Sequence, residues 1–337
     1  MSSPPFAVDF AYRPRLADLR PLLPAQPAGL RSAEPRITPA ASLADRQGYQ
    51  ADFLGDFQVP WPRPSAALAG DVYPLPASGD RLDYTHFSVS LSRSRRMALW
   101  VGVNIAGDQH LEVPRSRDAW AYDGRVPLEA QLGEALYADN LLDRGHLVRR
   151  QDPNWGPEAT QANKDTFHFT NCAPQMAAFN QKTWLELEDY ILDNTQRWQA
   201  RVSVFSGPVL RADDRAYRDA RIPEAFWKVV AFLADDGKPS ASAYLIDQRR
   251  ELDELSIAFG RLRTYQCSVL RIEQLTGIDF GPLRDHDGFS NEERVTGSPV
   301  ERAIFGPADI LLYPGCTQAR GRLLRTPSSA SRITPTR

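Results

Sequence analysis

The strongest chemical signal in the sequence is the tetrapeptide Asp143-Arg-Gly-His146, which is followed closely by Arg149. His146 is the one histidine of five that has arginines close by and a glycine directly before it. An imidazole can take a proton from water, and the guanidinium of Arg144 can balance the charge of a phosphate group. Gly145 carries no side chain that would keep a phosphodiester away from the backbone. The tetrapeptide therefore predicts a hydrolytic site for phosphodiesters.

A second group of polar residues lies downstream of His146. It comprises the block Thr170-Asn-Cys-Ala-Pro-Gln175, and then Asn180 and Glu188. A helix that starts near residue 179 would place Asn180 and Glu188 on one face, about 12 Å apart along its axis. One neutral amide ligand leaves most of a metal ion's coordination positions to water and phosphate oxygens, which suits Mg²⁺. By residue type alone Asn180 is an ordinary helix N-cap, and only its position relative to His146 favours a metal ligand.

Three blocks of sequence together resemble the DNA/RNA non-specific endonucleases, a family of ββα-metal nucleases that includes endonuclease G. The blocks read DRGH, FTNCAPQ and NQxxWxxLE, in this order along the chain. The similarity extends from about residue 49 to residue 280, where Leu275–Phe280 resembles a structural element near the end of the domain. The resemblance implies hydrolysis of DNA and RNA with little sequence preference, with Mg²⁺ or Mn²⁺ as cofactor and with 5′-phosphate products.

The resemblance also implies a role for each matching residue. His146 matches the general base, and Asn180 matches the direct metal ligand. Arg144 and Glu188 match positions that assist at the phosphate and at the water molecules around the metal. We expect Asp143 to orient the loop.

Further site residues are expected around this centre. Asn171 and Gln175 match the polar block that braces the family's site, and together with Arg149 they are our candidates for contact with the substrate. An additional upstream arginine acts on the phosphate in the family. Here the segment Val113-Pro-Arg-Ser-Arg-Asp-Ala-Trp120 offers Arg115 or Arg117, and spacing does not choose between them.

The hydrophobic pattern indicates the elements that must position these residues. Apolar alternation predicts a hairpin from residues 86–91 and 97–105, and a second hairpin from 226–233 and 241–246 around an Asp-Gly turn. Helical spacing of apolar residues predicts helices over 184–192, 252–262 and 272–275. Strands and helices mix without repeated βαβ units. The expected fold is therefore α+β, a largely antiparallel sheet with flanking helices and a ββα-metal nuclease motif.

The chain has 337 residues and divides by composition into three parts. Eleven of the 27 prolines lie within the first 64 residues, which indicates a Pro-rich N-terminal arm over residues 1–48. This arm is expected either to be free or to pack on the domain or on a second subunit, which would make a homodimer. The endonuclease domain is expected over 49–315, followed by a basic tail over 316–337.

Composition excludes several other classes of protein. The net charge of −2 argues against a uniformly basic nucleic-acid coat, although 36 of the 40 basic residues are arginines. Three scattered cysteines do not form a zinc or disulfide framework, and no run of 18 apolar residues predicts a membrane span. No secretory signal is recognised, so we expect a cytoplasmic protein or one exported by a signal-independent route.

Two alternative functions stay open at this point. One is a catalytically silent module that binds nucleic acid, and the other is a narrower phosphodiesterase that acts on small nucleotides. A general nuclease endangers its own cell, so we expect a defence effector or an antibacterial toxin that is restrained by an inhibitor or another regulatory partner. DNA and RNA are the expected substrates.

Overall fold

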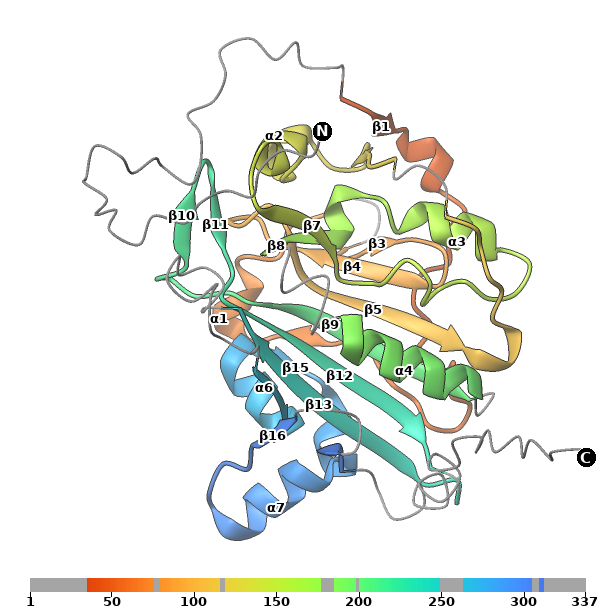
Figure 1. Ribbon diagram of the computed structural model, residues 1–337, viewed down its shortest axis with the longest axis vertical. Coiled ribbons are helices and arrows are strands. Elements are labelled where there is room, and N and C mark those ends of the chain that lie inside the picture. The colour runs from red at the N-terminus through yellow and green to blue at the C-terminus, as the bar shows by residue number, and fades with distance from the viewer. Residues whose placement is uncertain are drawn as a thin grey trace, which may run out of the picture.

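An eight-stranded antiparallel sheet forms the centre of the computed structural model (Figure 1). The structure describes residues 35–75, 79–115, 119–176, 185–197, 200–234, 236–248, 263–304 and 309–311. In order across the sheet the strands are β16 (Arg302–Ile304), β14 (Arg263–Cys267), β13 (Pro239–Asp247), β12 (Ala225–Leu233), β9 (Arg201–Val209), β5 (Ala98–Ala106), β4 (Phe87–Leu91) and β3 (Leu82–Asp83).

Both predicted hairpins are present in this sheet. Strand β4 pairs with β5, and β12 pairs with β13 over nine residue pairs from Ala225↔Asp247 to Leu233↔Pro239. The long strands are rich in β-branched and aromatic residues, which fit a pleated surface that is covered on both sides. Gly237 has a φ of +77° in the turn between β12 and β13, a conformation that glycine adopts without strain.

Short helices flank the sheet. They are α1 (Ala66–Ala69), α2 (Glu134–Tyr137), α3 (Ala159–Asp165), α4 (Leu185–Arg197), α6 (Val269–Thr276) and α7 (Gly288–Thr296). Helices α4 and α6 correspond to two predicted helices, whereas the helix expected over 252–262 lies outside the described residues. Helix α6 begins after Ser268, whose hydroxyl accepts a hydrogen bond from the Arg271 amide, and ends at Gly277 with a φ of +70°.

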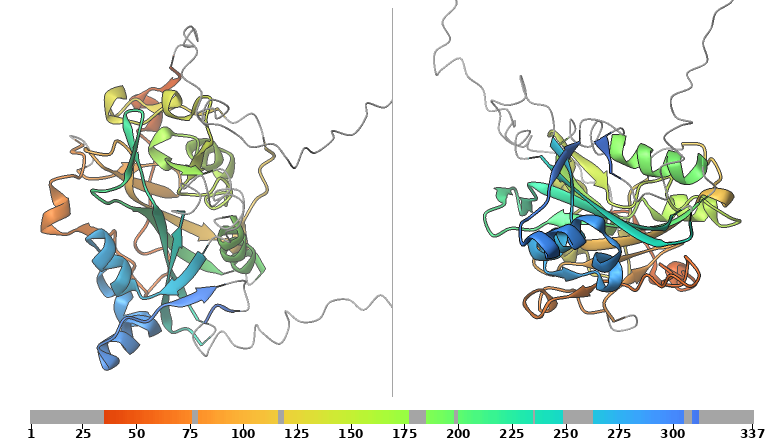
Figure 2. Two further views of the ribbon diagram at one scale, coloured as in Figure 1. Left: turned by 60° about the vertical axis from the view of Figure 1, so that its left-hand side comes forward. Right: turned by 90° about the horizontal axis from the view of Figure 1, so that it is seen from below.

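The sheet separates two hydrophobic layers (Figure 2). On one face, α3 and α4 cover a core that includes Val101, Val204 and Ile191. On the other face, α6 and α7 lie over a second core built around Trp227 and Phe280. The sequence prediction of an α+β fold with a largely antiparallel sheet and flanking helices is confirmed. Within the described residues, no helix is long and apolar enough to cross a membrane.

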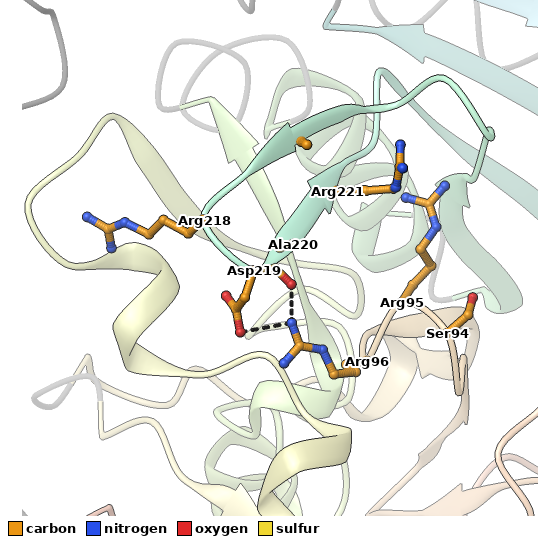
Figure 3. A pocket seen from close by; sticks show the side chains of 8 residues that line it. Ser94, Arg95, Arg96, Arg218, Asp219, Ala220 and Arg221 are labelled. Atoms are coloured by element: carbon orange, nitrogen blue, oxygen red, sulfur yellow. Dashed lines mark hydrogen bonds and ion pairs between the residues drawn. The ribbon is translucent and has the colours of Figure 1, made fainter.

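In the described part of the chain, four two-stranded ribbons accompany the main sheet. They are β1 (Ile37–Thr38) with β6 (Tyr122–Asp123), β2 (Arg63–Pro64) with β15 (Ile278–Asp279), β7 (Leu142–His146) with β8 (Cys172–Met176), and β10 (Arg215–Tyr217) with β11 (Ala220–Ile222). The β10–β11 hairpin follows β9, and its residues line one wall of a surface pocket (Figure 3).

The end of the expected arm packs on the domain. Strand β1 pairs in parallel with β6, and Leu43 is buried in the first core. The Arg46 guanidinium donates a 2.7 Å hydrogen bond to the Asp165 carboxylate. Residues 35–48, the end of the expected arm, therefore pack on the domain. Residues 1–34 and the basic tail lie outside the described part of the chain.

Candidate active site

The two polar sequence blocks meet in the β7–β8 ribbon. Strand β7 carries Asp143-Arg-Gly-His146, and β8 carries the end of the second block. The antiparallel register places His146 opposite Cys172 and Asp143 opposite Gln175. Along the described residues, β7 is followed by helix α3, then by β8 and then by α4. Segments almost thirty residues apart in the sequence thus form one unit on the face of the sheet that α4 covers.

The absence of a side chain at Gly145 leaves room for Gln175, which lies on the neighbouring strand two residues beyond the one opposite Gly145. A Cβ atom at Gly145 would lie 2.0 Å from the Gln175 Oε1 atom and 2.1 Å from its Cδ atom. Gln175 is fully buried, so its side chain has little room to move aside. A glycine was expected here to let a phosphodiester approach the backbone. In the structure the space beside Gly145 is filled by the Gln175 side chain instead.

The His146 ring is held between two aromatic side chains. Its centroid lies 4.7 Å from that of Trp120, in a tilted arrangement, and 5.1 Å from that of Phe167, edge to face. The residue is half-buried, at the end of β7. Packing on two rings limits the orientations of the imidazole, which a general base needs if its nitrogen is to meet one particular water molecule.

Arg144 lies beside His146 and contacts the short helix α2. Its guanidinium forms an ion pair with Glu134 and lies over the Tyr137 ring, 5.5 Å from the centroid. Glu134 is largely exposed, and its pair with Arg144 lies near solvent, where such pairs contribute little. A phosphodiester has one negative charge and two nonbridging oxygens, as a carboxylate has, so it could replace Glu134 as the partner of this guanidinium.

Asn171 braces the backbone that leaves β7. Its Oδ1 accepts a 2.9 Å hydrogen bond from the Val148 amide, and its Nδ2 donates to the carbonyls of Val148 (2.9 Å) and Thr166 (3.0 Å). The side chain is fully buried, and its bonds fix the segment directly after His146. Direct contact of Asn171 with substrate stays a prediction.

Glu188 projects from α4 into a buried cluster of charges. Its Oε1 lies 3.2 Å from the Lys228 Nζ on β12, and Lys228 also donates a 3.0 Å hydrogen bond to the Ser206 hydroxyl. Burial raises the pKa of Glu188 to about 7, although the positive charges of Lys228 and Arg149 oppose the rise. Burial likewise raises the pKa of Asp152, which belongs to the same cluster.

Lys228 and Asp152 were not predicted as part of the site. Lys228 interrupts the apolar run Ala-Phe-Trp-Lys-Val-Val-Ala-Phe-Leu of β12, and the chain contains only four lysines. A lone lysine in a central strand must find a buried partner, because an unpaired buried ammonium is costly. A lysine within an apolar strand was therefore the feature of the sequence that could have indicated a buried charged cluster.

Arg149 connects β7 to α4. Its Nη2 lies 2.5 Å from the Asp189 Oδ1, and Asp189 directly follows Glu188. Arg149 also interacts electrostatically with Glu188 and Asp152. One ion pair thus joins the segment after His146 to the helical turn that carries Glu188. Its partner in the structure is a carboxylate of the protein, and a role in contact with substrate stays a prediction.

The remaining predicted residues are only partly described. Arg115 is exposed, two residues after Val113, whose carbonyl accepts a 3.0 Å hydrogen bond from Arg150. This contact brings the Arg115 segment near the basic stretch after β7. Arg117 and Asn180 lie outside the described residues, as does the expected start of the helix near residue 179. The choice between Arg115 and Arg117 therefore stays open.

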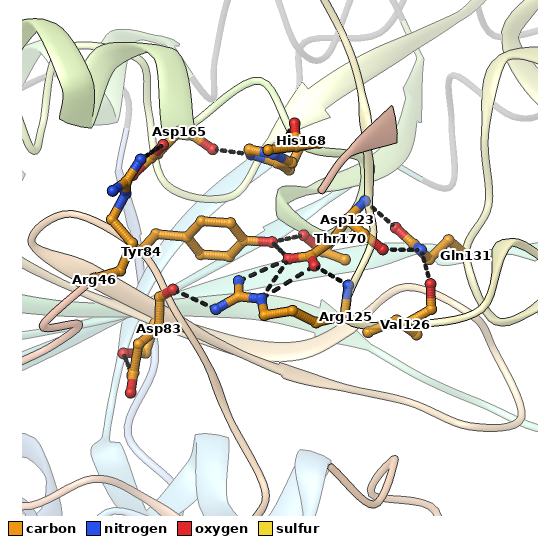
Figure 4. Close-up of polar contacts among 12 residues, drawn as sticks. Arg46, Asp83, Tyr84, Asp123, Arg125, Val126, Gln131, Asp165, His168 and Thr170 are labelled. Carbon is orange, nitrogen blue, oxygen red and sulfur yellow. Dashed lines mark hydrogen bonds and ion pairs between the residues drawn. The ribbon is translucent and has the colours of Figure 1, made fainter. Parts of the chain in front are cut away.

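A buried polar cluster packs against the loop that precedes β8 (Figure 4). The Tyr84 hydroxyl donates to the Asp123 carboxylate (2.5 Å) and contacts the Thr170 hydroxyl (2.6 Å). Arg125 forms an ion pair with Asp123 at 2.7 Å. Burial alone would raise the pKa of Asp123, but the hydrogen bonds and charge of Arg125 outweigh burial and hold this pKa below its usual range. Thr170 directly precedes Asn171, so the cluster anchors the loop that enters β8.

Few clustered metal-binding side chains are seen in the described part of the chain. Among the described residues, no three His, Cys, Asp or Glu side chains form a cluster that could hold a metal. Asn180, which the sequence predicts as the direct metal ligand, lies outside these residues.

The comparisons with known proteins agree with this geometry. Residues 64–286 match the family model described as DNA/RNA non-specific endonuclease. The match covers more than half of the chain and includes β7, β8 and α4. The chain therefore belongs to the DNA/RNA non-specific endonuclease family, a family of typically metal-dependent nucleases.

Individual relatives cover different parts of the chain. It is 38% identical over 321 residues to the uncharacterized protein y4fB of Sinorhizobium fredii, covering 86% of this chain but only 47% of that protein. It is 26% identical over 227 residues to mitochondrial endonuclease G of Bos taurus, covering 62% of this chain and 72% of that protein. A crystal structure of an EndoG/EndoGI complex matches with a TM-score of 0.49 and 19% identity, over 61% of this chain and 86% of that chain.

Proposed function

We propose that this chain is a Mg²⁺-dependent endonuclease that hydrolyses phosphodiester bonds of DNA and RNA with little sequence preference. The main observation behind the proposal is the ion pair between Arg149, just after β7, and Asp189 on α4. This link brings the strand of His146 and Arg144 together with the helical turn of Glu188. Family membership supports the same chemistry.

In this proposal each residue of the ribbon has a distinct task. His146, oriented by Trp120 and Phe167, takes a proton from the attacking water. Arg144 exchanges Glu134 for a nonbridging phosphate oxygen and neutralises part of its charge. His146 acts on the attacking water and Arg144 on the phosphate, and neither contacts a base, which would explain weak sequence preference.

The metal would be held by few groups of the protein. Asn180 would contact the ion directly, and Glu188 would accept hydrogen bonds from its water molecules. A bound Mg²⁺ would supply positive charge for the phosphate and for the leaving 3′ oxygen. The buried cluster keeps a positive charge beside Glu188, which favours its carboxylate form.

A metal titration tests the proposal. Purified chain should convert supercoiled plasmid to nicked and linear forms with Mg²⁺, should degrade RNA, and should be inactive in EDTA. Mn²⁺ is expected to substitute for Mg²⁺. Cleavage of a dinucleotide or a cyclic nucleotide but of no polymer would contradict the proposal and favour the narrower phosphodiesterase.

The cellular setting is a separate hypothesis. Because indiscriminate cleavage harms the host, we propose that the protein is either held inactive in the cell by an inhibitory partner or exported, as a defence effector or antibacterial toxin. Expression of the active chain alone should then stop growth of a bacterial host, and His146→Ala should relieve the arrest. Normal growth with active enzyme would remove the need for restraint.

A further inference from the structure

A surface pocket with four arginines among its lining residues, here called the arginine pocket, lies between the β10–β11 hairpin and the turn after β4 (Figure 3). Its volume is about 350 Å³. Its lining residues are Ser94, Arg95, Arg96, Ala216, Arg218, Asp219, Ala220 and Arg221. Apart from two alanines, every lining side chain is polar or charged. A pocket of this composition is suited to an anion and not to an apolar ligand.

Positive charge in this pocket exceeds negative charge. Arg96 is 2.9 Å from the Asp219 carboxylate, and Arg95 is 2.8 Å from the buried Asp214 carboxylate below the pocket. Arg221 donates instead to the carbonyls of residues 212 (3.0 Å) and 214 (3.2 Å), which carry no net charge. The pocket thus has four arginines and only two carboxylates paired with them, and the guanidinium of Arg218 is directed towards α2.

Two of the guanidinium groups are held close together. Arg95 and Arg221 both contact the turn over residues 211–214, and their guanidinium groups lie side by side at one end of the pocket. The Arg95 side chain is 11% exposed, and its buried Nη1 donates no hydrogen bond within the described residues. The Arg95 guanidinium is thus held in place by Asp214 and by the turn, and its positive charge stays beside that of Arg221.

The pocket is coupled to the candidate active site through helix α2. Arg218 donates hydrogen bonds to carbonyls at this helix, at 3.2 Å to residue 136 and 2.8 Å to residue 138. Glu134, the first residue of the same helix, forms the ion pair with Arg144. One four-residue helix thus separates the arginine pocket from the arginine that we assign to the scissile phosphate. Because successive phosphates of a strand are only about 3.4 Å apart along its axis, a bound polynucleotide would reach the pocket within a few nucleotides.

We propose that the arginine pocket binds a backbone phosphate of the nucleic acid, a few nucleotides away from the bond that is cut. This inference rests on the proposed function and adds a second point of contact on the substrate. A contact of this kind contributes to the affinity for polymers and makes no distinction between bases. A short substrate that ends before α2 gains nothing from it.

Binding measurements on the full chain test the pocket. In the His146→Ala background, which slows cleavage, fluorescence anisotropy would follow binding of a 30-nucleotide single strand and of a trinucleotide. Arg221→Gln and Arg96→Gln should each weaken binding of the long strand about three- to ten-fold and reduce its salt slope by about 0.7, the value for one lost phosphate contact. Trinucleotide binding should not change. Arg302→Gln, an exposed arginine on β16 at the far edge of the sheet, is the matched control and should bind both like the parent.

The outcomes separate the pocket from the proposed function. Two results would contradict the proposed role of the pocket. One is unchanged binding of the long strand in both pocket variants, and the other is an equal loss of binding for the long strand and the trinucleotide. Inorganic phosphate that binds in an Arg221-dependent way without competing with the long strand would make the pocket a site for a free anion, and would also overturn the proposal. Absence of cleavage by the unmodified chain, with the length-dependent loss of binding preserved, would contradict the endonuclease and leave the pocket in place.

Discussion

Glu188 of helix α4 and Lys228 of strand β12 form an ion pair in the protein interior, with 3.2 Å between Oε1 and Nζ. The two side chains are only 6% and 2% exposed. A buried pair gains little over apolar packing, but removal of one partner leaves the other charge uncompensated. Lys228 therefore both fixes the position of Glu188 and favours its ionised form, which links the core of the sheet to the candidate active site.

Lys228→Met should consequently destabilise the protein. We expect the free energy of unfolding to fall by about 3 kcal/mol at pH 8, because Glu188 loses its buried partner. The loss should shrink at pH 5. Because the pKa of Glu188 is raised in the folded state, its contribution to stability is complete below the pKa of the unfolded state and is lost as the pH rises through the folded-state pKa. At pH 5 Glu188 is protonated and needs no positively charged partner. Urea denaturation at the two pH values measures both effects.

Two further variants control for this result. Lys238→Met removes a lysine that is 64% exposed and should change the free energy of unfolding by less than about 0.5 kcal/mol. The double variant Glu188→Gln/Lys228→Met should be more stable than the sum of the single losses predicts. Simple additivity of the two losses would show that the pair has no coupling energy.

Gly145→Ala should be destabilising because of the contact with Gln175. The new Cβ atom would lie 2.0 Å from the Gln175 Oε1, so the buried amide must shift. We expect a loss of about 1–3 kcal/mol, the usual range for overpacking. Gln175→Ala in the same chain should recover part of the loss, as measured by thermal or urea denaturation. Equal losses with and without Gln175 would place the cause in the backbone.

Histidine burial predicts a decline of stability in mild acid. Burial lowers the pKa of His168, whose Nδ1 lies 2.8 Å from the Asp165 carbonyl and whose Nε2 lies 2.9 Å from the Thr38 hydroxyl. The unfolded chain then binds the proton first, so this contribution is complete above pH 6.5 and is lost as the pH falls towards the folded-state pKa. The advantage of the parent over His168→Asn should therefore shrink between pH 7.5 and pH 5.5. A difference independent of pH would refute the assignment.

Much of the fold was accessible from the sequence because its signals are local. Apolar alternation and an Asp-Gly turn marked the β12–β13 hairpin, and helical spacing marked α4 and α6. The DRGH block marked the strand of the candidate site for the same reason, since its residues are contiguous.

Long-range contacts could not be predicted in this way. The packing of Gln175 over Gly145 depends on the register of β7 and β8, which no local pattern fixes. The contact of Lys228 with Glu188 depends on how α4 lies on the sheet. The pairing of Arg144 with Glu134 likewise joins two segments that carry no common motif.

Asn180→Ala should change the metal requirement as well as the rate. If Asn180 is the direct ligand, its loss should raise the Mg²⁺ concentration needed for half-maximal activity and lower the maximum rate. A plasmid-nicking assay over a range of Mg²⁺ concentrations measures both quantities. A lower rate with an unchanged Mg²⁺ requirement would place the ion on other residues.

The most direct test of the proposed endonuclease compares the unmodified chain with His146→Ala on double-stranded DNA, single-stranded DNA and RNA at matched nucleotide concentration with Mg²⁺. We expect the unmodified chain to cut all three polymers, and the variant to turn over about 10²- to 10⁴-fold more slowly on each while it keeps its fold and its affinity for DNA. Near-normal turnover by the variant, or cleavage confined to a single polymer, would contradict a non-specific endonuclease that uses His146 as its base.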